Sequence, residues 1–186
     1  MKTMPEDRHG KTIFIIPGFR HHPKHKAYKA IAKILKSEGY LTVSVTIPWK
    51  QTTISQNTQY FLKEYKKIKT KKKYILGFSF GAMIAFLAST KVEVYGLILC
   101  SLSPYFKEDL PSSNFHCAQV AKQTKAKQIL MLYGEKEAKP LIKRVNQAFY
   151  QIPSPHKYLV SIKKTEHNIG DKRYLHTIHQ AAKVLN

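Results

Sequence analysis

Cysteine is scarce in this chain, and its cysteines do not have the spacing of a metal site. The 186 residues include two cysteines, Cys100 and Cys117, and neither belongs to a C-x-x-C or zinc-type motif. Such a low cysteine content is typical of a reducing compartment, and we therefore expect a cytoplasmic protein. Cys100 ends an apolar run and is expected to be a small core residue.

Long hydrophobic runs are also missing. No apolar stretch reaches the roughly 18–20 residues that a membrane-spanning helix needs, so we expect no transmembrane segment. Residues 1–9 lack the hydrophobic core of a secretory signal peptide, which argues against export by that route. Both absences agree with the cytoplasmic location that the cysteine content indicates.

Acidic residues are few compared with basic ones. Eleven aspartates and glutamates stand against 32 lysines and arginines, which gives a formal net charge of +21. A charge of this size attracts polyanions such as nucleic acid or an anionic membrane surface. Seven lysines lie between residues 63 and 73, yet no aromatic pattern of an RNA-reading motif accompanies them. We interpret them as a solvated face, and weak nonspecific binding to polyanions stays an open alternative.

Strands and helices alternate along the whole sequence. At 186 residues and 43% hydrophobic content, the chain is long and apolar enough to bury the core of one domain. We expect this single domain over residues 1–186, with a tail at residues 1–10, and we find no linker or repeat. The alternation predicts an α/β fold with six mainly parallel strands and helices on both faces. We expect strands at residues 11–16, 40–47, 74–76, 95–100, 128–133 and 156–162, and helices at residues 24–36, 55–69, 140–148 and about 174–185, besides one after residue 79. The alternating polarity of residues 40–47 predicts a strand near the sheet edge.

The third expected strand is followed at once by Gly77-Phe78-Ser79-Phe80-Gly81 and an Ala-rich apolar helix. A Gly-x-Ser-x-Gly between a strand and a helix is the sequence form of a nucleophile elbow, in which the serine lies on a tight turn at the end of the sheet. The two glycines let strand and helix approach closely, and the positive end of the helix dipole faces the serine. Ser79 is therefore the candidate nucleophile.

A serine hydroxyl attacks efficiently only when a base removes its proton, and a histidine held by a carboxylate is the usual base. In a parallel sheet the functional loops lie at the carboxyl ends of the strands. Among the histidines downstream of Ser79, His167 is the one expected just past such an end. His156 would open a strand, and His176 and His179 belong to the last helix.

These loops together resemble the α/β-hydrolase superfamily. The resemblance spans nearly the whole domain and implies a three-layer fold in which serine, acid and histidine follow in that chain order. Members commonly carry the acid three residues after a glycine that follows the fifth strand, and here this position is Glu137, after Gly134. Aspartate is commoner than glutamate at that position. This departure leaves Glu135, and Asp109 or its neighbour Glu108, open as alternative acids.

The resemblance also implies an oxyanion hole built from two backbone N–H groups. One comes from the residue after the nucleophile, here Phe80. The other comes from the loop after the first strand, here Phe19 in Pro17-Gly18-Phe19-Arg20. Such a donor holds the negative oxygen of the tetrahedral intermediate and contributes about 2.7–4 kcal/mol of transition-state stabilisation.

Two segments are candidates for the substrate pocket. Residues 103–125 take the place of the cap of many relatives but are short, which predicts a minimal cap and an open site. Tyr105 and Phe106 in this segment could line an acyl pocket or simply pack against the sheet. Arg20 could meet an anionic part of the substrate at the pocket rim, or lie in a solvated loop.

The stretch Arg20-His21-His22-Pro23-Lys24-His25 contains three histidines. No cysteine or carboxylate accompanies them, and a proline interrupts the stretch. We therefore expect no metal here, and no cofactor for the reaction.

The sequence thus predicts a serine hydrolase of the carboxylesterase or thioesterase kind. Ser79 would form an acyl-enzyme with a small-molecule ester or thioester, or an amide, with His167 as the base and Glu137 orienting it. The alternative is a noncatalytic protein of the same fold that binds nucleic acid or a membrane through its basic surface. The oligomeric state is not readable from the sequence.

Overall fold

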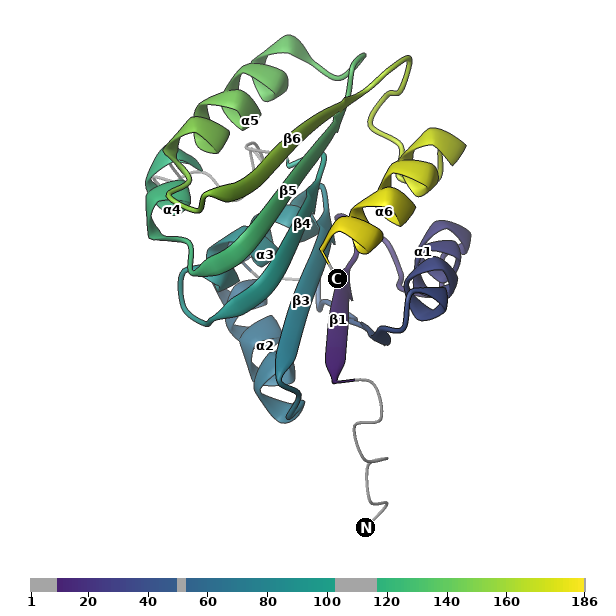
Figure 1. Ribbon diagram of the computed structural model, residues 1–186, viewed down its shortest axis with the longest axis vertical. Coiled ribbons are helices and arrows are strands. Elements are labelled where there is room, and N and C mark those ends of the chain that lie inside the picture. The colour runs from purple at the N-terminus through teal and green to yellow at the C-terminus, as the bar shows by residue number, and fades with distance from the viewer. Residues whose placement is uncertain (1–9, 50–52, 103–116, 186) are drawn as a thin grey trace.

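Six parallel strands form one sheet, and helices cover both of its faces (Figure 1). The computed structural model describes residues 10–49, 53–102 and 117–185. The strand order is β2-β1-β3-β4-β5-β6, and all five neighbouring pairs are parallel, so the described sheet is entirely rather than mainly parallel. The strands are β1 (Lys11–Ile16), β2 (Leu41–Ser44), β3 (Lys72–Phe78), β4 (Val94–Cys100), β5 (Ala126–Gly134) and β6 (His156–Ile162). The helices are α1 (Lys26–Ser37), α2 (Ile54–Lys67), α3 (Phe80–Ser89), α4 (Cys117–Gln123), α5 (Lys139–Gln151) and α6 (Lys172–Val184).

The two faces of the sheet bury two separate apolar cores. The side chains of β1 divide between them, because Phe14 and Ile16 belong to one core and Ile13 and Ile15 to the other. Helices α2, α3, α4 and α5 cover the first face, and α1 and α6 cover the second (Figure 1). Both faces of the central strands are therefore dry, which explains their unbroken apolar sequences.

The strand β2 lies at a sheet edge, as its alternating sequence predicts. Its residues are exposed at Leu41 and Ser44 and of intermediate exposure between them. It is shorter than the predicted strand at 40–47, although the Val45 N–H still donates to the Ile15 carbonyl at 2.9 Å. The side chains of Val45 and Ile47 turn back into the core beyond the strand.

Polar caps set the first residues of three helices and account for starts that differ from the predicted ones. The side chain of His25 accepts a hydrogen bond from the Ala27 N–H, so α1 begins at residue 26 instead of 24. Thr53 and Gln56 form a capping box in front of α2. Asp171 caps α6, which begins at residue 172 instead of 174.

The predicted cap-like segment, residues 103–125, is described only in its second half. Residues 103–116 lie outside the described residues, and with them the predicted pocket residues Tyr105 and Phe106. Residues 117–123 form α4, a helix that the weak periodicity of the segment did not predict. This helix packs beside α5 and buries Ala121 in the core.

The helix α3 is apolar on all sides, because nine of its 10 residues are buried. It therefore lies between the sheet and its neighbours α2 and α4 instead of facing water. Within the described ranges, no helix has both the length and the apolar character needed to cross a bilayer.

The start of α3 meets the ends of β1 and β3 through backbone alone. A Cβ placed on Gly81 would lie 2.3 Å from the carbonyl oxygen of Ile16 and 2.4 Å from that of Pro17. A Cβ on Gly77 would lie 2.4 Å from the carbonyl oxygen of Gly81. Because no side chain fits at these distances, the two glycines of the motif allow the contact that fixes the position of Ser79.

Replacing Gly77 by alanine should destabilise the fold. The added methyl group has no room unless the α3 backbone moves, and the free energy of unfolding should fall by about 2 kcal/mol or more in urea titrations. In Gly170→Ala the new Cβ would meet its nearest neighbour, a side-chain oxygen, at 3.3 Å, and stability should stay within about 0.5 kcal/mol of wild type. Equal stability of the two variants would contradict the packing argument.

Candidate active site

Ser79 lies on the turn between β3 and α3 in a backbone conformation that few residues adopt. Its φ is 55° and its ψ is −118°, and such strain costs about 1–3 kcal/mol at a residue other than glycine. Hydrogen bonds of the Ser79 backbone hold the turn. The Ser79 N–H donates to the Cys100 carbonyl on β4 at 2.8 Å, and the Ser79 carbonyl accepts from the Ala82 N–H at 2.9 Å. This is the geometry of a nucleophile elbow at the carboxyl end of the sheet.

His167 bridges Ser79 and Glu137. Its Nε2 lies 2.9 Å from the Ser79 Oγ, and its Nδ1 lies 3.2 Å from the Glu137 Oε2. The three residues come from the loops after β6, β3 and β5, which open on the same end of the sheet. A neutral imidazole that donates from Nδ1 to the carboxylate offers its unprotonated Nε2 to the serine hydroxyl.

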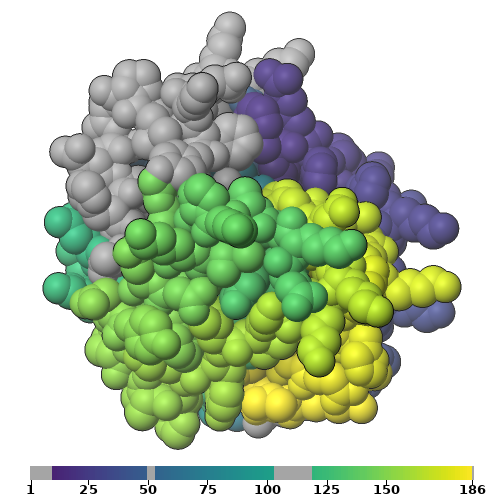
Figure 2. All heavy atoms as spheres, turned by 90° about the horizontal axis from the view of Figure 1, so that it is seen from above, coloured from purple at the N-terminus to yellow at the C-terminus, as the bar shows by residue number. Residues whose placement is uncertain are grey.

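The acid and the base of this group differ in exposure. The Glu137 side chain is 1% exposed, whereas that of His167 is 41% exposed. Figure 2 views this end of the molecule, where segments from the beginning of the chain (purple) and from its last third (green to yellow) lie side by side. The carboxylate of Glu137 is therefore buried, while the imidazole of His167 is partly exposed to solvent.

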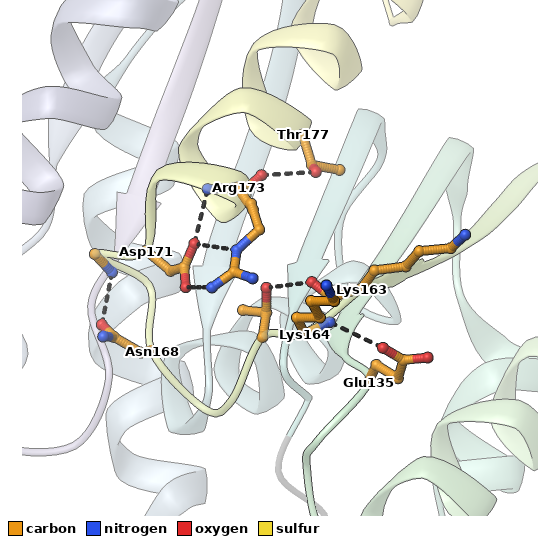
Figure 3. Close-up of polar contacts among 9 residues, drawn as sticks. Glu135, Lys163, Lys164, Asn168, Asp171, Arg173 and Thr177 are labelled. Carbon is orange, nitrogen blue, oxygen red and sulfur yellow. Dashed lines mark hydrogen bonds and ion pairs between the residues drawn. The ribbon is translucent and has the colours of Figure 1, made fainter.

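The loop between β6 and α6 is held on both sides of His167 (Figure 3). Before His167, the Lys164 N–H donates to the Glu135 carboxylate at 2.8 Å. After it, Asp171 accepts from the Arg173 N–H at 2.8 Å and pairs with the Arg173 guanidinium at 2.7 Å. The hydrogen bonds from Arg173 lower the pKa of Asp171, which stays ionised as the cap of α6.

The candidate acids differ in what they bind. Glu137 is the acid that lies within hydrogen-bond distance of His167 among the described residues. Glu135 turns instead to the backbone of the β6–α6 loop. The alternatives Asp109 and Glu108 lie outside the described ranges.

Two donors hold the buried carboxylate of Glu137. Its Oε1 accepts from the Gly134 N–H at 2.9 Å and from the Ser101 hydroxyl. The Ser101 hydroxyl also contacts the Tyr174 hydroxyl of α6. Neither Ser101 nor Tyr174 is predicted from the sequence. The one signal is that Ser101 directly follows β4, at the sheet end where the other site residues lie.

Cys100 lies fully buried beside this group, and its prediction as a core residue is confirmed. Burial raises the pKa of its thiol, and the nearby charge of Glu137 raises it further. The thiol therefore stays protonated and is a poor nucleophile.

The two predicted oxyanion donors belong to neighbouring segments. Phe80 is the first residue of α3, Phe19 follows β1, and the centroids of their rings lie 5.8 Å apart. The loop after β1 is fixed by Tyr28 of α1, whose hydroxyl accepts from the Gly18 N–H at 2.8 Å. The positive end of the α3 dipole favours negative charge beside Phe80.

Phe19, Phe80 and Trp49 form an aromatic cluster at the start of α3. The Trp49 ring lies 5.6 Å from that of Phe19 and 5.3 Å from that of Phe80, between centroids. Its indole nitrogen is buried and has no hydrogen-bond partner among the residues that the structure describes. The Arg20 guanidinium lies 4.9 Å from the centroid of the Phe19 ring, beside this cluster. Trp49 is not predicted from the sequence, because its position directly after a proline indicates only the end of a strand.

His21 belongs to the loop after β1. Its ring stacks on that of Phe78 at 6.2 Å, and its Nδ1 lies 2.9 Å from the Tyr28 hydroxyl, which can donate to it. Burial lowers the pKa of His21, and the neighbouring His25 and His167 lower it further. His21 is therefore neutral at pH 7, and it is hydrogen-bonded to Tyr28 although it is exposed at the surface.

The three histidines of the loop after β1 do not gather into a metal site. The rings of His21 and His25 stack at 5.8 Å, and the His22 Nδ1 accepts from the Lys24 N–H at 3.1 Å. Within the described part of the chain, no group of three or more histidines, cysteines or acids could hold a metal ion.

Comparison with known proteins gives a likeness in structure only. No protein-family profile and no curated protein sequence matches the chain. Est1E from Butyrivibrio proteoclasticus, solved with bound ferulic acid, superposes with a TM-score of 0.76 at 16% identity, over 98% of this chain and 91% of its own. A monoacylglycerol lipase from Paleococcus ferrophilus gives a TM-score of 0.76 at 12% identity, over 93% of both chains. A dienelactone hydrolase from Anabaena variabilis gives 0.71 at 17% identity, over 93% of this chain and 84% of its own.

Tyr28→Phe should loosen the loop after β1. The variant leaves the buried Gly18 N–H without its acceptor, which should lower the free energy of unfolding by about 1–3 kcal/mol and speed amide exchange at Gly18. Tyr150→Phe, at a tyrosine that is 74% exposed, should stay within about 0.5 kcal/mol of wild type. Wild-type exchange at Gly18 in Tyr28→Phe would show that the phenol does not hold this loop.

Proposed function

We propose that this chain, which has the α/β-hydrolase fold, is a serine hydrolase that cleaves an ester or thioester. One observation carries the proposal. The His167 ring lies between the other two side chains. Its Nε2 is 2.9 Å from the Ser79 Oγ, and its Nδ1 is 3.2 Å from the Glu137 Oε2. Their chain order of serine, acid and histidine is the order found in this fold.

The reaction would run through an acyl-enzyme. The His167 Nε2 takes the Ser79 proton as Oγ attacks the carbonyl carbon, and the oxyanion is held by the N–H groups of Phe19 and Phe80. The imidazolium gives this proton to the leaving alcohol or thiol. A water molecule then attacks the acyl group, again with His167 as the base, and the carboxylic acid leaves. Glu137 orients the imidazole and stabilises the imidazolium.

The surroundings of Ser79 favour an apolar acyl group. In the cluster of Phe19, Trp49 and Phe80, the rings of Phe19 and Trp49 are only partly buried and offer aromatic surface close to the residue that follows Ser79. Two proteins of similar structure point the same way, since Est1E was solved with ferulic acid and the Paleococcus protein is a monoacylglycerol lipase. A carboxylic ester of a small apolar acid is therefore our first choice of substrate class. The cytoplasmic location expected from the low cysteine content belongs to the same proposal.

A second function rests on the charge at the opposite end of the sheet. A cavity of about 230 Å³ lies at the amino ends of β3, β4 and β5, and its lining includes Lys71, Lys73 and Lys127. Lys72 and Lys127 both lie over the ring of Tyr95, at 4.6 and 5.7 Å from its centroid. We propose weak polyanion binding at this surface, and it would not compete with catalysis at the carboxyl ends of the strands.

Ser79→Ala should abolish hydrolysis. Without the Oγ no acyl-enzyme forms, so kcat/KM toward p-nitrophenyl acetate should fall by about 10³-fold or more, and labelling by a fluorophosphonate probe should vanish. The control is Ser89→Ala at the last residue of α3, the helix that follows Ser79. The Ser89 hydroxyl donates to the Phe86 carbonyl at 2.6 Å. This control should label like wild type. Wild-type protein that neither hydrolyses nor labels, beside a responsive control hydrolase, would overturn the proposal.

Polyanion binding should depend on salt and not on Ser79. Anisotropy of a fluorescent single-stranded oligonucleotide should report binding that weakens as the salt concentration rises and is equal in wild type and Ser79→Ala. Replacing Lys71 and Lys127 by glutamine should weaken it more than the same change at Lys29 and Lys33, which are exposed on α1. If both double variants lose the same amount of oligonucleotide affinity, the net charge of the protein and not this surface attracts the oligonucleotide.

A further inference from the structure

We propose that Ser101 is a positioning residue, which directs the Glu137 carboxylate at His167 and is itself held by Tyr174. The inference rests on the proposed function, in which Glu137 orients the catalytic base. The sheet order gives Ser101 its place. Strand β4, which ends just before Ser101, lies between β3, which leads to Ser79, and β5, which leads to Glu137.

Ser101 is buried and strained. It is 0% exposed, and its φ of 48° lies in the left-handed region that serine rarely adopts. Its N–H donates to the Leu132 carbonyl of β5 at 2.7 Å, which ties the turn to the neighbouring strand. Strain of this kind persists only where surrounding contacts hold it, and here it accompanies a hydroxyl that reaches the buried acid.

Proton counting gives the hydrogen bonds of this group a direction. A carboxylate has no proton, so the Ser101 hydroxyl must donate to the Glu137 Oε1. Because the one hydroxyl proton of Ser101 is donated to Glu137, the Tyr174 hydroxyl, 2.5 Å away, must be the donor to the Ser101 oxygen. The other acceptor near Tyr174, the Leu132 carbonyl, lies farther away at 3.3 Å. Burial, followed by the neighbouring Cys100 and Glu137, raises the pKa of Tyr174, so the phenol keeps this proton.

The second donor matters because the acid is a glutamate. A glutamate has one more rotatable bond than an aspartate, and the Gly134 N–H alone fixes Oε1 at a single point. With the Ser101 hydroxyl as a second donor on the same oxygen, the carboxylate plane is set and Oε2 is left for the Nδ1 of His167, 3.2 Å away. Ser101 therefore determines which oxygen meets the imidazole, and through it the tautomer of His167.

Ser101→Gly tests this role without the usual cost to the fold. Glycine adopts the φ of 48° without strain, so the variant should fold, while Glu137 loses one donor. We expect kcat on p-nitrophenyl acetate to fall roughly tenfold to hundredfold with KM within about twofold.

A readout that needs no activity is the tautomer of His167, measured by ¹⁵N NMR of the imidazole. Wild type should carry its proton on Nδ1, and Ser101→Gly should show a mixture of both tautomers. Tyr174→Phe keeps the Ser101 donor, so it should hold the wild-type tautomer and lose less than about tenfold in kcat. The matched control is Ser89→Ala, which removes another fully buried, hydrogen-bonded serine hydroxyl and should change stability alone.

Each outcome decides the proposal. A Ser101→Gly variant with wild-type kcat and tautomer would overturn it, as would a loss of thermal stability and activity together with an unchanged tautomer. If wild type proves inactive, the proposed hydrolysis fails but the positioning role is still tested. A single Nδ1 tautomer that becomes mixed in Ser101→Gly would support it, and a mixture already present in wild type would contradict it.

Discussion

The candidate site depends on a place where backbone meets backbone. Gly81 has no side chain that would strike the carbonyls of Ile16 and Pro17, and Gly77 leaves room for the carbonyl of Gly81. This contact seats the first turn of α3 against the end of β1. The Ser79 turn and the loop after β1, which are distant in sequence, are therefore held together by close backbone packing, and the proposed oxyanion donors are held with them.

A wholly parallel sheet sends its functional loops to one end. Following the strand order β3, β4, β5 and β6, these loops contribute Ser79, Ser101, Glu137 and His167 in turn. Residues separated by 88 positions in the chain thus come within 2.9 Å of each other. The favourable free energy of forming the sheet and its two cores offsets the conformational entropy that is lost when these loops are ordered. The polar contacts of the site therefore need not stabilise the fold and can be selected for chemistry.

The fold and the placement of Ser79 and His167 at the carboxyl end of the sheet were predictable because each has a pattern of its own. Unbroken apolar strands, the edge strand at β2 and the Gly-x-Ser-x-Gly turn can be read from a few neighbouring residues, and the predicted α/β-hydrolase fold is confirmed. The choice between Glu135 and Glu137 was left open by the sequence, because both lie in one loop and only its turn directs Glu137 inward. Ser101 and Tyr174 have no local pattern, since Ser101 contacts Glu137 across 36 positions and Tyr174 contacts Ser101 across 73 positions.

The unequal exposure of Glu137 and His167 gives the site a dry half and a wet half. On the dry side the charge of the acid is poorly screened, so its attraction for the imidazolium stays strong as salt rises. On the wet side the His167 side chain is exposed, so water can reach it. An acyl group carried by Ser79 would meet bulk water before it met a dilute alcohol. Such exposure would suit the proposed hydrolysis of esters better than their synthesis by acyl transfer.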